Sequence, residues 1–331
     1  MADSPKIVVT RRIPEPAIDL LREAGDVWVS PDDRPLETEE LHDAVKGADV
    51  ALTLLHDNVD GAFLDAAGDQ LRAVCNVAVG FDNIDVPAAT ERGVLITNTP
   101  GVLTDATADL AMTLILAATR RIGEGERLLR NREPWSWHMF MLLGMGLQGK
   151  TLGVVGMGAI GQALARRAKA FGMEIVYFDA QPADEAVERE LGARRVELDE
   201  LLRTADVVSI HAPLMGSTRH LIDAEALATM KETAYLVNSA RGPIVDEAAL
   251  AEALKSGQIA GAGLDVFENE PEVHPGLLEL DNVVILPHLG SATIETRTAM
   301  ACLAAKNAIA VLKGEQPPTP VNPEVLQAAR S

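Results

Sequence analysis

Short apolar runs alternate with segments of helical periodicity along the 331 residues, and this alternation restricts the folds open to the chain. Apolar runs separated by amphipathic segments are typical of parallel sheets covered by helices on both faces. The runs predict strands at Lys6–Thr10, Val50–Leu54, Ala73–Asn76, Val94–Thr97, Lys150–Gly156, Glu174–Phe178, Val207–Ile210, Tyr235–Asn238, Gly261–Val266 and Val283–Leu286. The periodicity predicts helices at Glu15–Ala24, Thr38–Gly47, Asp60–Gly68, Thr104–Arg121, Ala159–Phe171 and Ile294–Leu312. The predicted class is α/β, with doubly wound parallel sheets.

The pattern is interrupted near residue 100, where Pro100 and Gly101 follow a predicted strand. A length of 331 residues is long for one compact core and sufficient for two domains. We therefore expect two α/β domains. Periodicity alone does not assign the Ala-rich helix at Ile294–Leu312 to either of them.

The charge of the chain argues against several kinds of partner. Forty-nine acidic and 29 basic residues give a formal net charge of −20. Such a field repels nucleic-acid phosphates and anionic lipids, so we expect neither as a partner. No stretch approaches the roughly 20 apolar residues of a membrane span, and the first residues lack the apolar block of a signal peptide. Two separate cysteines form neither a disulfide framework nor a metal cluster, so we expect a cytoplasmic protein without a metal.

A glycine-rich turn follows one of the predicted strands. Gly156, Gly158 and Gly161 fit the pattern G-x-G-x-x-G, with Ala159 and Ile160 opening the helix that follows. In this context the first glycine permits a tight turn, the second allows a pyrophosphate to approach, and the third lets helix and strand pack closely. The N–H groups at the helix N-terminus then face the phosphates. The turn predicts a dinucleotide site.

An acidic residue ends the next predicted strand. Asp179 stands 23 residues after Gly156, where a carboxylate accepts hydrogen bonds from the adenosine ribose hydroxyls. No Lys or Arg follows until Arg189, so a 2′-phosphate would meet this carboxylate without a neutralising group nearby. The sequence therefore predicts NAD rather than NADP.

Three polar residues follow three later strands. Arg241, Glu270 and His288 each come shortly after an apolar run, and the carboxyl ends of parallel strands face one crevice. Arg241 suits the binding of a substrate carboxylate, and His288 suits proton donation to a carbonyl that accepts a hydride. Glu270 beside His288 would favour the charged form of the imidazole. Each residue alone also fits an ordinary structural role, whereas the set predicts a site for reducing a 2-keto acid.

The chain resembles the D-isomer-specific 2-hydroxyacid dehydrogenase family over nearly its whole length. The resemblance rests on Gly156–Gly161, Asn238–Asp246, Gly263–Pro271 and Pro287–Ala292. It implies a Rossmann nucleotide domain at residues 100–289, inserted into a flavodoxin-like substrate domain made of residues 1–99 and 290–331, with the active site in the cleft at the hinge. The final helix would thus belong to the substrate domain.

The resemblance also implies roles for further residues. Asp265 would bind the nicotinamide carboxamide, and other positions would line the cofactor, namely Thr107, Pro213, Thr218 and Ala240. Val79 and Gly80, within Val77–Asp82, would bind the substrate carboxylate together with Arg241.

Within the family, three segments resemble glyoxylate/hydroxypyruvate reductases: Leu54–Asp60 including Leu55, the Trp135–Gly144 segment, and Pro317–Asn322. In such enzymes a Trp matching Trp137 reaches the substrate pocket of the neighbouring subunit, near an Arg matching Arg297. A homodimer formed through the helix at Thr104–Arg121 and the following arm is therefore expected.

Two alternatives stay open at this point. The chain could be a D-2-hydroxyacid dehydrogenase acting on another substrate, because glyoxylate and hydroxypyruvate differ from other small 2-keto acids by few atoms. It could also be an NAD-sensing binding protein similar to the transcriptional corepressors of the family, since these retain the same Arg, Glu and His.

Overall fold

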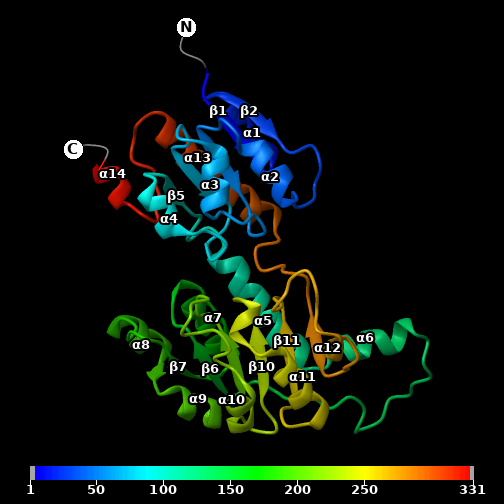
Figure 1. Ribbon diagram of the computed structural model, residues 1–331. Coiled ribbons are helices and arrows are strands. Elements are labelled where there is room, and N and C mark those ends of the chain that lie inside the picture. The colour runs from blue at the N-terminus through cyan, green and yellow to red at the C-terminus, as the bar shows by residue number, and fades with distance from the viewer. Residues whose placement is uncertain (1–3, 329–331) are drawn as a thin grey trace. The chain divides into compact units, whose positions relative to one another are not determined.

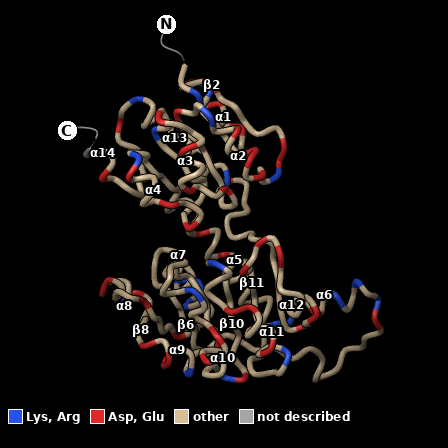
Figure 2. The backbone as a smooth tube through the Cα atoms, viewed as in Figure 1, with Lys and Arg blue, Asp and Glu red and all other residues tan. Residues whose placement is uncertain are grey.

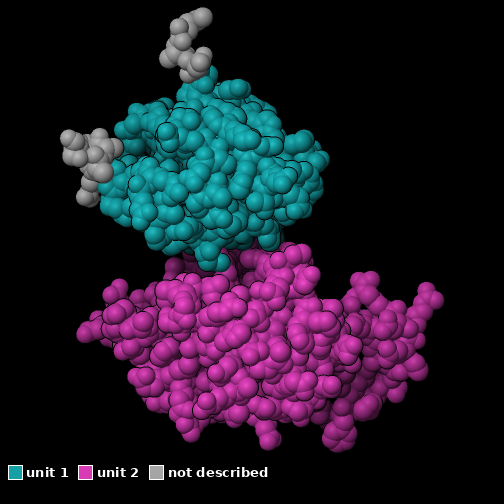
Figure 3. Space-filling view, viewed as in Figure 1, with its two compact units in different colours: residues 1–103, 292–331 teal, residues 104–291 magenta. Residues whose placement is uncertain are grey.

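The computed structural model describes residues 4–328, which form two compact units (Figure 3). Unit 1 comprises residues 1–103 and 292–331, and unit 2 comprises residues 104–291. Each unit is built around its own sheet, with a hydrophobic core on each face of that sheet.

The sheet of unit 1 has five parallel strands in the order β2-β1-β3-β4-β5. This is the flavodoxin-like order of a doubly wound sheet. The strands are β1 (Lys6–Val9), β2 (Asp26–Val29), β3 (Val50–Thr53), β4 (Ala73–Asn76) and β5 (Leu95–Thr97). The central strands β3 and β4 are buried throughout, which explains why they are continuous apolar runs instead of alternating ones.

Helices cover both faces of this sheet (Figure 1). They are α1 (Glu15–Arg22), α2 (Thr38–Val45), α3 (Gly61–Ala67), α4 (Val86–Glu91), α13 (Ile294–Leu312) and α14 (Glu324–Ala328). One core joins α1 and α13 to the sheet, and α2 and α3 pack in a second core. The face of α13 in contact with β3 and β4 carries buried alanines, whose small side chains bring the helix close to the strands.

The sheet of unit 2 has seven parallel strands in the order β12-β11-β10-β9-β6-β7-β8. They are β6 (Thr151–Val155), β7 (Glu174–Phe178), β8 (Arg194–Arg195), β9 (Val207–Ile210), β10 (Tyr235–Asn238), β11 (Gly261–Leu264) and β12 (Val283–Ile285). Counted from β6, the first six strands follow the Rossmann order 3-2-1-4-5-6. The order reverses between β6 and β9, and ligands bind at such a point, beyond the carboxyl ends of the strands.

Two layers of helices enclose this second sheet. The helices are α5 (Thr104–Thr119), α6 (Ile122–Arg130), α7 (Ala159–Ala170), α8 (Glu185–Leu191), α9 (Leu198–Thr204), α10 (Ala224–Thr229), α11 (Glu247–Ser256) and α12 (Pro275–Leu278), with a short 3₁₀ turn at Gly242–Ile244. The core on one face contains α5 and α7, and the core on the other contains α9, α10 and α11.

The predicted fold class is confirmed, and the predicted strands and helices are present with ends that differ by at most two residues. The sequence analysis omitted the edge strands β2 and β8 and several short helices. Trp28 in β2 is partly exposed, and β8 has two exposed arginines, so neither strand forms an apolar run.

Acidic residues are distributed over both units (Figure 2), and no helix among residues 4–328 is long and apolar enough to cross a membrane.

Candidate active site

The glycine-rich turn connects β6 to α7 in unit 2. Gly156 has a φ of +96°, and a Cβ there would lie 2.6 Å from the backbone nitrogen of Ala212, so only glycine fits without movement. A Cβ on Gly161 would lie 2.2 Å from the carbonyl oxygen of Gly156. Both positions therefore keep the strand, the turn and the helix in close contact.

The N-terminus of α7 has the features of a phosphate site. Gly158 is the N-cap and supplies no side-chain cap, and no atom lies within 4 Å of where its Cβ would be. Ala159 and Ile160 form the first turn, whose N–H groups lack carbonyl partners within the helix. Open space beside these N–H groups and the positive end of the helix fit the pyrophosphate of a dinucleotide.

Asp179 follows β7 and lies beside this turn. One oxygen of its carboxylate accepts the N–H of Met157 at 2.8 Å, and the other accepts the N–H of Gln181 at 3.1 Å. The carboxylate is thus held next to the glycine-rich turn, as a residue that binds the adenosine ribose must be.

Arg195 brings a positive charge to the same place, and the sequence analysis did not find it. Its guanidinium donates to the backbone carbonyls of Asp179 at 2.8 Å and Ala180 at 3.3 Å. The two residues are 16 positions apart in sequence, so only the pairing of β7 with β8 brings the guanidinium to the end of β7. The expectation that no cation lies near Asp179 is wrong for this reason.

Other expected cofactor residues form two groups in unit 2. The Thr107 hydroxyl donates to the carbonyl of Gly290 at 3.3 Å, and the N–H of Gly290 donates to Asp265 at 2.8 Å. The Thr218 hydroxyl donates to the carbonyl of Pro213 at 2.7 Å, which closes the turn after β9. Thr107 and Asp265 are thus together, and Pro213 and Thr218 form a separate group.

Glu270 and His288 are in direct contact. The Nδ1 of His288 lies 2.9 Å from one carboxylate oxygen of Glu270, and the other oxygen accepts the N–H of Phe267 at 3.1 Å. Both side chains are partly buried. A carboxylate on Nδ1 fixes the ring orientation and leaves Nε2 as the atom able to give or take a proton.

The backbone of His288 has a φ of +55°, which is unusual for a residue with a side chain. Asp265 holds the chain in this conformation: its carbonyl accepts the N–H of His288 at 2.8 Å, and its carboxylate accepts those of Leu289 and Gly290 at 2.6 and 2.8 Å. Burial raises the pKa of the Asp265 carboxyl, and the two N–H donors act in the opposite direction. A strained histidine held in this way is typical of a functional site.

Arg241 follows β10, the strand next to β11. Its backbone carbonyl accepts the side-chain amide of Asn238 at 2.9 Å, and its guanidinium donates to the carbonyl of Ala240 at 2.8 Å. A Cβ on Gly242 would lie 1.9 Å from the backbone of Phe267, so the loop of Arg241 packs directly on the loop of Glu270. Neighbouring parallel strands thus carry all three predicted catalytic residues at their carboxyl ends.

In unit 1, the expected substrate residues lie in two loops joined by a polar network. Asn83 donates to the carbonyls of Leu54 and Asp57 at 3.1 and 2.8 Å, beside Leu55. Asn76 donates to the carbonyl of Gly80 at 2.9 Å and lies 3.3 Å from the side-chain oxygen of Asn83. The loops after β3 and β4 are therefore held as one element.

Further contacts complete this network. Val79 accepts the side-chain amide of Asn98 at 2.8 Å. The Asp57 carboxylate accepts the N–H of Leu54 at 2.7 Å and the hydroxyl of Thr10 at 2.5 Å, and burial raises its pKa. The sequence analysis did not single out Asn76 and Asn83, although an Asn at the end of a buried strand indicates a hydrogen-bonded role.

Trp137 lies in the segment that follows α6, which extends away from the body of unit 2 (Figure 1). Its side chain is 76% exposed. Large apolar side chains are exposed along this arm, defined here as residues 122–143: Ile122, Leu129, Trp135, Trp137, Met139, Phe140 and Leu143.

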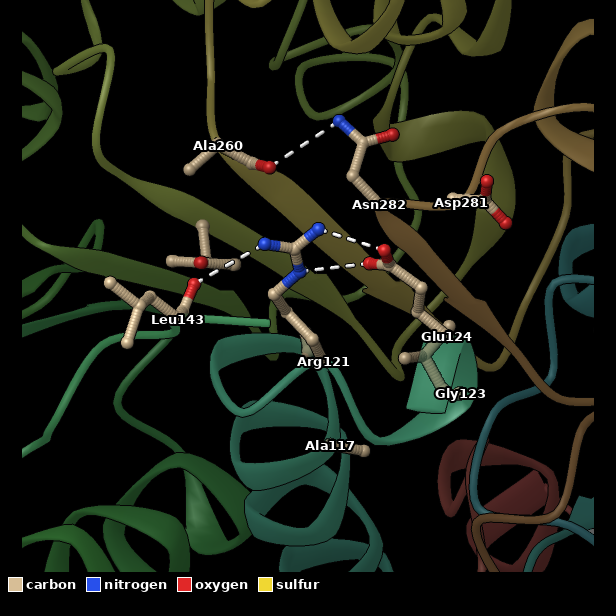
Figure 4. A pocket seen from close by; sticks show the side chains of 11 residues that line it. Ala117, Arg121, Gly123, Glu124, Leu143, Ala260, Asp281 and Asn282 are labelled. Carbon is tan, nitrogen blue, oxygen red and sulfur yellow. Dashed lines mark hydrogen bonds and ion pairs between the residues drawn. The ribbon is translucent and has the colours of Figure 1, made fainter. Parts of the chain in front are cut away.

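A cavity of about 260 Å³ adjoins the arm (Figure 4). Its wall contains Arg121, whose guanidinium makes two hydrogen bonds to Glu124, both of 2.8 Å, and a longer one of 3.4 Å to the carbonyl of Leu143. Apolar side chains of Tyr235 and Val284 also line it. Tyr235 is the first residue of β10, and Asn282 of the cavity wall directly precedes β12, so the cavity lies at the amino ends of these strands, opposite to the ends that carry the Glu270–His288 pair.

The comparisons with known proteins agree with these features. The sequence model of the D-isomer specific 2-hydroxyacid dehydrogenase NAD binding domain matches residues 112–290. The chain is 50% identical to a glyoxylate reductase of Thermococcus onnurineus, over 98% of each chain.

Two solved structures have the same fold as this chain. A glyoxylate reductase from Paecilomyes thermophila has a TM-score of 0.88 and 35% identity, over 98% of this chain and 100% of that chain. An NADPH-dependent glyoxylate/hydroxypyruvate reductase from Sinorhizobium meliloti has a TM-score of 0.81 and 34% identity, over 96% and 97%. The resemblance inferred from the motifs is confirmed: the chain belongs to the D-isomer-specific 2-hydroxyacid dehydrogenase family.

Proposed function

We propose that the protein uses NADH to reduce glyoxylate and hydroxypyruvate to the corresponding D-2-hydroxy acid. The names of similar proteins support this substrate class. The observation that carries the proposal is the 2.9 Å contact between Glu270 and His288, in a unit that contains an NAD-binding domain.

The residues present fit a dinucleotide. Gly156, Gly158 and Gly161 would hold the pyrophosphate at α7, and Asp179 would accept the ribose hydroxyls. Asp265 would bind the nicotinamide carboxamide, and other cofactor contacts would come from Thr107, Pro213, Thr218 and Ala240. A bound reduced nicotinamide supplies a hydride to the substrate carbonyl carbon.

The chain itself supplies the charge and the proton. Arg241 binds the substrate carboxylate and polarises the carbonyl, because a guanidinium forms paired hydrogen bonds with such groups. His288 donates a proton from Nε2 to the carbonyl oxygen as negative charge develops there. Glu270 on Nδ1 stabilises the charged ring before that transfer. In unit 1 the proposed substrate-binding residues are Leu55, Val79 and Gly80, so unit 1 is the proposed substrate domain.

The preference for NADH over NADPH is also a proposal. The Asp179 carboxylate would repel a 2′-phosphate, whereas Arg195 would attract one. The Asp179 side chain faces the turn that holds the cofactor, while Arg195 is engaged by backbone carbonyls, so we expect the carboxylate to dominate.

We further propose a homodimer in the cytoplasm. We expect a second copy to cover the exposed apolar arm and the cavity beside it, because a group of large exposed apolar side chains is typical of an interface. Trp137 would then lie in the substrate pocket of the partner, near Arg297. Cys75 and Cys302 are free thiols, which accords with a reducing compartment.

Oxidation of NADH, followed by its absorbance, tests the proposed reaction. The panel contains glyoxylate, hydroxypyruvate, pyruvate and a bulky 2-keto acid, each assayed with NADH and with NADPH. We expect turnover of about 1–10³ per second with the two small polar acids and NADH. Turnover of the bulky acid alone would indicate a dehydrogenase with another substrate. NADH binding without turnover of any acid would indicate an NAD-sensing protein.

A further inference from the structure

A carboxylate outside the catalytic loop holds that loop at two points. Glu247 is the first residue of α11 and is 6% exposed. One of its carboxylate oxygens accepts the N–H of Glu268, and the other accepts the N–H of His274 at 3.3 Å. Glu270, the partner of His288, lies between these two points of attachment.

The Glu247 side chain is not needed to cap its own helix. The N-cap of α11 is Asp246, whose carboxylate accepts the N–H of Ala249 at 2.9 Å. The carboxylate of Glu247 is directed instead toward the loop that follows β11. Its contacts therefore serve the loop and not the helix.

Burying this carboxylate is unfavourable in itself. Burial raises the pKa of Glu247, and the nearby carboxylate of Glu268 raises it further, while the two backbone N–H donors oppose the shift. A buried charge is retained where it satisfies groups that would otherwise lack partners. Here those groups are the N–H groups of Glu268 and His274, at the two sides of Glu270.

The side chain of Glu268 extends the connection to a second loop. Its carboxylate lies 2.5 Å from Nε2 of His220 and 3.5 Å from the guanidinium of Arg219. These two residues directly follow Thr218, which closes the turn proposed to line the cofactor. Glu247 and Glu268 thus join the loop of Glu270 to that turn.

We infer that Glu247 is a positioning residue for catalysis: it fixes the loop that places the Glu270 carboxylate on Nδ1 of His288. This inference rests on the proposed function, because it takes the Glu270–His288 pair as the proton donor. The hydrogen bonds of the Glu247 carboxylate are to the backbone N–H groups of Glu268 and His274, so it acts through the backbone of the loop.

The first test compares Glu247→Gln with Glu252→Gln, a change at an exposed position of the same helix. The amide keeps one acceptor oxygen but turns an NH₂ group toward the other backbone N–H. We expect Glu247→Gln to lower kcat with glyoxylate about tenfold, and KM and the Kd for NADH to change less than about twofold. The alkaline limb of its kcat–pH profile should move in the same direction as that of Glu270→Gln. Glu252→Gln should match the wild type.

The second test asks whether Glu247 acts through Glu270. If it does, the double variant Glu247→Gln/Glu270→Gln has the kcat of Glu270→Gln alone, because no carboxylate is then left on Nδ1 of His288 for Glu247 to position. A further loss in the double variant, or wild-type kcat and pH profile in Glu247→Gln, would overturn the inference. If Glu270→Gln itself keeps wild-type turnover, the proposed function fails instead.

The role of Glu247 can also be tested if Glu247→Gln does not fold. Glu247→Asp keeps the charge and shortens the side chain by one methylene, so it cannot reach both N–H groups. If Glu247→Gln does not fold, the same kinetic expectations apply to Glu247→Asp, and wild-type behaviour there overturns the inference.

Discussion

His288, the proposed proton donor, has its backbone in the left-handed region, with a φ of +55°. A residue with a Cβ adopts this conformation only where its surroundings impose it. The surroundings here are the carbonyl and carboxylate of Asp265, together with the Glu270 carboxylate on the ring. These contacts fix the orientation of the ring, which would reduce the reorganisation needed for the proposed proton transfer.

Substitutions of Arg241 and of His288 should change different kinetic constants. We expect Arg241→Ala to raise KM for glyoxylate by about 10²-fold, because the substrate loses a charged hydrogen-bonding partner. His288→Ala should lower kcat by about 10²–10⁴-fold with a smaller change in KM, because it removes the proton donor. Steady-state kinetics with glyoxylate distinguish the two, and near-normal constants in both variants would contradict the proposed mechanism.

We expect His211 to make the free energy of unfolding depend on pH. Burial lowers the pKa of this imidazole from 6.5 to about 4, and its Nε2 lies 2.8 Å from the hydroxyl of Ser209. The unfolded chain therefore binds a proton near pH 6.5, whereas the folded chain binds one only near pH 4. The free energy of unfolding should fall as the pH falls through this window, by up to about 3 kcal/mol from this group.

Chemical denaturation of His211→Gln between about pH 7 and about pH 4 measures this contribution. We expect the variant to lose less stability than the wild type across the window, since glutamine does not titrate. The substitution His42→Gln, on a helix of unit 1, is the control and should show the wild-type dependence. Equal slopes in the wild type and His211→Gln would refute the assignment.

The proposed catalytic residues of unit 2 depend on the close packing of elements that follow neighbouring strands. The loops after β10 and β11 touch at Gly242, where a Cβ would lie 1.9 Å from the carbonyl carbon and oxygen of Phe267. The loops after β11 and β12 are joined through Asp265. The spacing of these loops therefore sets the position of Arg241 relative to the Glu270–His288 pair.

Gly242→Ala should damage both stability and activity, because backbone atoms must move to admit the new methyl group. We expect a loss of about 1–3 kcal/mol in the free energy of unfolding and at least about tenfold in kcat. Gly146→Ala is a matched control, since no atom lies within 4 Å of its Cβ position. Thermal unfolding and glyoxylate kinetics provide the measurements, and a Gly242→Ala enzyme equal to the control would be contrary evidence.

At the scale of helices and strands, the sequence predicted the central strands well and the edge strands poorly. Strands such as Ala73–Asn76 and Val207–Ile210 are buried on both faces, so their composition alone distinguishes them. Edge strands such as β8 depend on pairing with β7 and carry charged residues that resemble a loop. The site shows the same contrast. Glu270 and His288 follow recognisable strands, whereas Arg195 approaches Asp179 only through the folded sheet.

On the scale of the whole molecule, the exposed arm of unit 2 predicts self-association. Replacing two arm residues in Leu129→Glu/Phe140→Glu should convert a dimer into a monomer, because charges would be buried at the interface. Size-exclusion chromatography with light scattering measures the mass. The control is Trp28→Glu, at an exposed apolar position in the edge strand β2 of unit 1, and it should stay dimeric. A wild-type monomer, or a dimeric arm variant, would contradict the proposed assembly.

The two-part makeup of unit 1 has a consequence for synthesis on the ribosome. All five of its strands precede residue 104, but α13, which covers one face of that sheet, is made only after the whole of unit 2. Unit 2 is continuous and can fold as soon as it emerges. Until α13 is made, the part of the N-terminal sheet that it covers stays exposed to water, and chaperones would be needed most during this interval.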